Sequence, residues 1–145
     1  MRGAAQTLRR RVGHRGSALL FFALVDVVYC WSMIFPASPD QQGPWLRYLA
    51  GVLPLPVWGV AWGTVGLICL RAAFQRQDAG AFAAAVGIKA LWATLALAAG
   101  VAGGVDRWYV TAVVWLAFAG FVGIIASWPE PPHGWKDRQW TSPSG

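Results

Sequence analysis

The stretch LLFFALVDVVYCWSMIF, residues 19–35, decides the fold because it is almost wholly apolar and nearly long enough to cross a membrane. A helix rises about 1.5 Å per residue, so about 20 apolar residues cover the hydrocarbon core of a bilayer. The stretch carries one charged residue, Asp26, near its middle. A carboxylate at that depth is costly unless another group neutralises it, so a partner of opposite charge is expected elsewhere in the chain.

The composition of the whole chain is also that of a membrane protein. Of its 145 residues, 57% are hydrophobic and 12% are charged, whereas soluble domains carry about 25% charged residues. The formal net charge of +6 raises the alternative of nucleic-acid binding. However, most basic residues lie in the tails and between apolar segments, where membrane topology accounts for them. We therefore expect a lipid bilayer as partner and no nucleic acid.

Four apolar segments predict four membrane-spanning helices, because each is close to the required length and none is interrupted like the strands of a barrel. They lie at about residues 18–35, 52–70, 79–101 and 108–127. The expected fold class is all-α, a polytopic membrane protein with four transmembrane helices in a bundle over residues 18–128. A basic tail at 1–17 and a Pro- and Trp-rich polar tail at 129–145 flank this domain.

The ends of the spans carry recognisable signals. Ser17, Asp78 and Asp106 stand at expected helix N-caps, and the pair Gly103-Gly104 is an expected terminator. The start of the second span is open, since Pro54 and Pro56 interrupt the sequence PWLRYLAGVLPLP. Residues 45–52 therefore form either a short interfacial helix or the beginning of that span.

Basic residues predict the orientation, because Lys and Arg concentrate in cytoplasmic flanks. The loops after the first and third spans contain only Arg47 and Arg107. The tails and the remaining loop contain Arg2, Arg9, Arg10, Arg11, Arg15, Arg71, Arg76, Lys136 and Arg138. We expect both termini on the cytoplasmic side of the inner membrane of a bacterial host.

Small residues predict close helix packing, since lipid provides no hydrophobic force that drives helices together. They form stripes in three of the spans, and such stripes pack helices within one chain, join chains into a homo-oligomer, or do both. The residues are Gly59, Gly63 and Gly66 in the second span, Gly87 in the third, and Ala119, Gly120 and Gly123 in the fourth.

The spans contain only two charged residues, Asp26 and Lys89. Asp26 lies about 12 Å into the first span and Lys89 about 15 Å into the third, which runs in the same direction. The similar depths predict an ion pair, in which Tyr29 donates a hydrogen bond to Asp26 and Trp92 offers its ring to Lys89. Such a pair either fixes the helix register or forms a proton- or ion-responsive site or a polar lining.

Signs of catalysis are missing from the sequence. Both histidines lie in the tails, and we find no nucleophile–base arrangement, phosphate-binding loop or set of metal ligands. Cys30 and Cys69 lie far apart within apolar runs, as small hydrophobic residues do. We therefore expect no enzyme activity, no cofactor and no metal.

Four stretches together resemble a known group of proteins: RGSALLFFALVDVVYCWSMIFP, VLPLPVWGVAWGTVGLICL, AFAAAVGIKALWA and VVWLAFAGFVGIIASWPEPP. They are similar to small four-span integral membrane proteins of actinobacterial phages, notably those that infect Streptomyces, and cover residues 16–132. Asp26, Lys89 and the sequence WPE at 128–130 belong to this pattern. The resemblance implies a phage origin.

The general build of the chain resembles that of holins, which oligomerise in the host membrane and open lesions that let an endolysin through. The alternative is a non-lytic accessory or anchoring protein of the host envelope. A third class, the small multidrug-resistance carriers, has an acidic residue midway along its first span, as Asp26 is here. Those carriers use a free glutamate, whereas Lys89 would neutralise Asp26.

Overall fold

The computed structural model describes residues 2–75 and 78–128, with side chains from residue 14 onward apart from that of residue 39. Its regular elements are all helices, which confirms the expected all-α fold. Four are long and apolar enough to cross a membrane, at His14–Ile34, Leu55–Ala72, Ala79–Gly103 and Trp108–Ser127. The helices are α1 (Arg2–Ile34), α2 (Pro44–Val52), α3 (Leu55–Ala72), α4 (Ala79–Gly103) and α5 (Trp108–Ser127), with a 3₁₀ turn at Pro39–Gln41.

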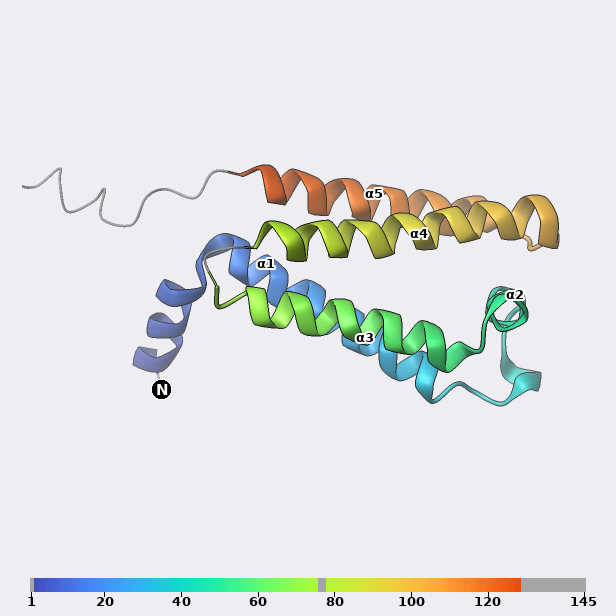
Figure 1. Cartoon of the computed structure of the whole chain (residues 1–145), viewed down its shortest axis with the longest axis horizontal. Coiled ribbons are helices and arrows are strands. Elements are labelled where there is room, and N and C mark those ends of the chain that lie inside the picture. Colours follow the sequence, from blue (N-terminus) through green and yellow to red (C-terminus); the bar gives the residue numbers. More distant parts are fainter. Residues whose placement is uncertain (1, 76–77, 129–145) are drawn as a thin grey trace, which may run out of the picture.

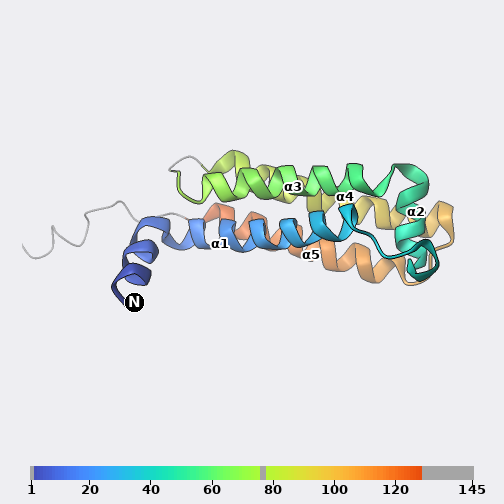
Figure 2. The same ribbon diagram turned by 90° about the horizontal axis from the view of Figure 1, so that it is seen from below.

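The bundle consists of two helical hairpins lying side by side. Helix α1 packs along α3, and α4 packs along α5, while fewer contacts join one hairpin to the other (Figure 1). The short helix α2 lies across one end of the bundle (Figure 2). The boundary between the two hairpins is therefore a distinct seam, formed mainly by α1 and α3 on one side and α4 and α5 on the other.

Both ends of the described chain lie at the same end of the bundle. The start of the α1 span, the end of α3 and the end of α5 gather there, whereas α2 and the α4–α5 turn lie at the opposite end (Figure 1). Arg15 and Arg71 thus belong to the first end, and Arg47 and Arg107 to the second. Arg76 and the side chains of Arg9, Arg10 and Arg11 lie outside the described residues, as do Lys136 and Arg138.

Helix α1 begins earlier than expected, at Arg2. Ser17 lies inside the helix and is not its N-cap, so residues 2–17 of the expected basic tail are helical. The reason is local, since Ala, Arg, Gln and Leu in this segment are good helix formers and nothing in it breaks the hydrogen-bonded ladder. The N-terminal part of α1 turns away from the bundle (Figure 1).

The region between the first two spans forms its own helix, α2, and α3 begins at Leu55 rather than at residue 52. Leu53 is extended (φ −149°, ψ 151°), because the ring of a following proline disfavours the helical region for the residue before it. Pro54 is the N-cap of α3, and Pro56 lies in its first turn, where a proline nitrogen needs no hydrogen-bond partner. The indole of Trp58 donates to the carbonyl of Leu49 at 3.3 Å and ties α2 to α3.

The caps of α4 and α5 differ in part from the expected ones. Asp78 is at the N-cap position of α4 but makes no side-chain capping bond. Arg107, not Asp106, is the N-cap of α5, with a left-handed φ of 56°. Helix α4 ends as expected, since Gly104 adopts a φ of 60° that glycine tolerates without a steric penalty.

The small residues of α3 lie against α1. A Cβ added at Gly59 would lie 2.9 Å from Ile34 Cγ1, and one added at Gly63 would lie 2.9 Å from Cys30 Sγ. A Cβ added at Gly66 would lie 3.3 Å from the Cβ of Asp26 on α1. The absence of side chains at these three positions therefore sets the close approach within this hairpin.

Other small residues behave differently. Ala119 is buried, but a Cβ added at Gly87, Gly120 or Gly123 would meet no atom within 4 Å. Of the two roles expected for the small-residue stripes, packing within the chain does not apply to these three glycines, because they face outward. They remain accessible to lipid or to a second copy.

Candidate functional site

A buried ion pair lies at the centre of the seam between the hairpins. The ammonium of Lys89 on α4 donates a hydrogen bond to Asp26 Oδ1 on α1 at 2.9 Å. Both side chains are 0% exposed. The structure thus brings together the two charges that the sequence places within the spans. The pair connects one hairpin to the other.

The two residues meet because α1 and α4 run parallel in a common register. A second ion pair joins the same elements, in which Arg15 Nη2 donates to Asp78 Oδ1 at 2.8 Å. Arg15 precedes Asp26 by the same 11 residues by which Asp78 precedes Lys89. Eleven residues are close to three helical turns, or about 16 Å, so both pairs lie along one line on facing helices.

Aromatic rings surround the ammonium of Lys89. Its Nζ lies 5.3 Å from the ring centroids of Trp62 and Phe118 and 5.7 Å from that of Phe22. Ring faces attract cations, and more strongly where water is excluded. The three rings come from α3, α5 and α1, so every spanning helix contributes to the environment of this charge.

The sequence analysis missed these three residues. Phe22 has a local signal, since it precedes Asp26 by four residues and shares its helix face. Trp62 and Phe118 have none, because only the packing of α3 and α5 brings them to Lys89. Trp92, the expected partner of the ammonium, instead meets the rings of Trp58 and Trp62 edge-on, at 5.6 and 5.2 Å.

Tyr29 contributes its ring, not the expected hydrogen bond to Asp26. The ring stacks on Trp62 at 4.6 Å and meets Trp115 edge-on at 5.2 Å. Asp26 Oδ2 and Trp62 Nε1 are buried and have no hydrogen-bond partner among the residues that the structure describes. Each unsatisfied polar atom of this kind costs about 1–3 kcal/mol. The site is therefore tightly packed yet incompletely satisfied in its polar groups.

The chemistry open to the site follows from this geometry. The carboxylate is engaged by a cation and has no exposed surface, so the closed arrangement holds helices in place and does not offer a free acid or base. Within residues 14–75 and 78–128, no group of three or more His, Cys, Asp or Glu side chains could hold a metal ion. Cys30 and Cys69 are both free.

The fold and the site define a class of protein. Four long apolar helices indicate a membrane protein, and its two hairpins are joined across a seam that contains an intramembrane ion pair. Comparison with known proteins finds no match: no family model fits the sequence, and no curated protein or solved structure is significantly similar to it. The resemblance to actinobacterial phage proteins therefore stays a hypothesis.

Proposed function

We propose that this chain is a phage-encoded, holin-like protein that permeabilises the cytoplasmic membrane of its host during lysis. One observation supports the proposal above the others: Asp26 and Lys89, the charged pair within the spans, lie in the seam between two hairpins. Intramembrane ionisable groups commonly mark water or ion pathways. If the hairpins separate, these groups line the opening.

The energetics of the ion pair are compatible with two states, one in which the hairpins are packed together in lipid and one in which they are separated around water. A single charge at the centre of the membrane costs about 2.5–3.5 kcal/mol on insertion scales, so the hairpins resist separating into lipid while the pair is intact. In a lesion, water hydrates both Asp26 and Lys89 and removes that cost. The pair thus stabilises the closed chain in lipid but does not oppose a water-filled assembly.

The outward glycines of α5 suit lateral association. Gly120 and Gly123 are exposed, with open space where a Cβ would lie. Small residues on a lipid-facing helix allow the backbone of another helix to approach closely. In this proposal a homo-oligomer forms through α5, and both termini face the cytoplasm with the basic end of the bundle, which holds Arg15 and Arg71.

Inducible expression in a bacterium tests the proposal. We expect growth to stop abruptly and the membrane potential, followed with a voltage-sensitive dye, to collapse. A co-expressed endolysin without its own secretion signal should then lyse the cells. The variant Gly120→Leu/Gly123→Leu should delay or abolish lysis, whereas Gly80→Leu, at another open glycine of a spanning helix, should not. Expression to high level with an intact potential and no endolysin release would overturn the proposal.

A second candidate is a non-lytic accessory or anchoring protein of the host envelope. It is favoured by the enclosure of the ion pair, because a single chain buries both charges and surrounds the ammonium with its own rings. In that case expression leaves both growth and potential unchanged. A proton-coupled carrier has less support, because Lys89 engages the carboxylate that such a carrier needs free; drug tolerance that disappears in Asp26→Asn would indicate one.

A further inference from the structure

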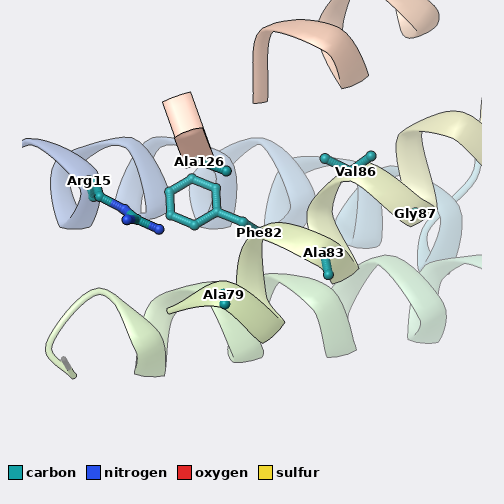
Figure 3. Close-up of a pocket in the computed structure, with 7 residues that line it drawn as sticks. All are labelled: Arg15, Ala79, Phe82, Ala83, Val86, Gly87 and Ala126. Carbon is teal, nitrogen blue, oxygen red and sulfur yellow. The ribbon is translucent and has the colours of Figure 1, made fainter. Parts of the chain in front are cut away.

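A groove opens at the end of the bundle where the Arg15–Asp78 pair lies. Its volume is about 460 Å³, and it is bounded by α4, by Arg15 of α1 and by Ala126 of α5 (Figure 3). Its mouth at Arg15 lies about three helical turns from the Asp26–Lys89 pair, and neither Asp26 nor Lys89 lines the groove. Arg15 is the one charged residue of its lining, and the other lining residues are apolar.

The apolar part of the groove follows the axis of α4. Ala79, Ala83 and Gly87 recur every four residues, so they lie in line on one face of the helix, and all three are exposed. They span about 12 Å along the helix. The ring of Phe82, which is 2% exposed, is the best-buried part of the lining. Small side chains therefore leave an apolar channel along α4 that is open to the surroundings.

The cation lies at one end of this channel. Arg15 Nη2 pairs with Asp78, and the guanidinium carbon lies 5.1 Å from the centroid of Phe82 (Figure 3). Arg15 Nε is buried without a hydrogen-bond partner among the described residues. A guanidinium has five N–H donors and suits phosphate oxygens. Asp78 orients this group but does not use all of its donors.

The position of the cation matches the depth of lipid headgroups. Arg15 is the second residue of the span His14–Ile34, and Ala79 is the first of Ala79–Gly103. The groove thus begins at the membrane surface with a cation and continues toward the hydrocarbon core with apolar walls. An anionic phospholipid is complementary to this arrangement, because its charged phosphate lies at the membrane surface and its acyl chains extend into the hydrocarbon core.

We propose that this groove binds an anionic phospholipid, with its phosphate at Arg15 and one acyl chain along Ala79, Ala83 and Gly87. Charge complementarity at the mouth distinguishes this ligand from zwitterionic lipid, whose phosphate carries its own cation. It also distinguishes lipid from a second copy of this chain. The aspartates of α1 and of the start of α4, Asp26 and Asp78, are already paired with Lys89 and Arg15. The proposal is independent of lysis.

Native mass spectrometry of the full chain in detergent tests this site, using phosphatidylglycerol and phosphatidylcholine with identical acyl chains. A charge-assisted hydrogen bond is worth enough for an approximately tenfold preference for phosphatidylglycerol. Arg15→Gln should abolish the preference, whereas Arg71→Gln, which removes an exposed arginine at the same end of the bundle, should retain it. Ala83→Leu/Gly87→Leu should reduce the binding of both lipids by filling the channel.

The channel-filling variant keeps the test decisive if Arg15→Gln does not fold, because it leaves the Arg15–Asp78 pair intact. Gly80→Leu is its matched control, an open glycine of α4 that does not line the groove, and should bind lipid like the unchanged chain. Equal binding of the two lipids by the unchanged chain would overturn the proposal. Unchanged phosphatidylglycerol binding by Ala83→Leu/Gly87→Leu would also overturn it. If this variant instead lost dimers without a change in bound lipid, the groove would be assigned to a second copy of the chain.

Discussion

Asp26 lies on α1 directly opposite Lys89 on α4, with its Oδ1 2.9 Å from the ammonium, and the charges are reversed at the other pair on the same two elements. There the cation, Arg15, is on α1 and the anion is Asp78. Sliding α4 by three turns in one direction would oppose the two aspartates, and in the other direction the two cations. Like charges at close range repel, so this pattern permits one register between the hairpins.

The central pair should dominate the stability of the seam. We expect Asp26→Asn to lower the free energy of unfolding by about 3–5 kcal/mol, because it leaves Lys89 buried without a counter-charge. The double variant Asp26→Asn/Lys89→Gln should recover part of this loss. Denaturation in mixed detergent micelles, followed by Trp fluorescence, measures both. A double variant as unstable as the single one would contradict the coupling.

The peripheral pair should matter much less. The side chains of Arg15 and Asp78 are 19% and 16% exposed, and ion pairs near water contribute at most about 1 kcal/mol. We therefore expect Arg15→Gln to lower the free energy of unfolding by no more than about 1 kcal/mol, measured in the same way. A loss as large as that of Asp26→Asn would show that the two pairs are equally shielded from water.

The ring of Trp62 should stabilise Lys89 independently of its indole nitrogen. Trp62→Phe keeps a ring face near the ammonium and removes the unpartnered Nε1, so we expect a small effect. Trp62→Leu removes the cation–π contact and should cost about 2 kcal/mol or more. The difference between the unfolding free energies of the two variants separates the contribution of the ring face from that of side-chain packing. Equal losses in the two variants would rule out a contribution from the ring face.

The α1–α3 contact should not tolerate larger residues. Gly59→Ala brings a Cβ to 2.9 Å from Ile34 Cγ1 and 3.1 Å from the carbonyl of Cys30, so we expect a loss of about 1–3 kcal/mol from overpacking. Gly120→Ala has open space and should leave the melting temperature unchanged. Thermal unfolding in detergent compares the two. Similar melting temperatures would mean that α1 and α3 can separate without penalty.

The proposed orientation predicts which ends can be labelled from outside. In a background with Cys30→Ala and Cys69→Ala, Asp40→Cys and Arg107→Cys should react with a membrane-impermeant maleimide in intact cells. Arg71→Cys, at the opposite end of the bundle, should react only after the membrane is opened. The reverse pattern would place both termini outside, and labelling at both ends would indicate a mixed topology.

The sequence by itself determined the elements and the presence of a charge partner. Continuous apolar runs of near-bilayer length predict helices because every backbone polar group must be satisfied within the segment, and α5 spans Trp108–Ser127, the range expected from its residues. The pairing of Asp26 with Lys89 was predictable from their depths alone. Local exceptions, such as the extension of α1 through Ser17, arose where helix propensity outweighed an N-cap signal.

Only the tertiary structure decided how those elements meet. A stripe of glycines indicates close packing but does not specify its partner, so the sequence did not separate Gly59 and Gly63, which face α1, from Gly120 and Gly123, which face outward. Likewise, the rings of Trp62 and Phe118 reach Lys89 because α3 and α5 pack on either side of it. Rings distant in sequence converge only through the packing of whole helices, and no local pattern records that packing.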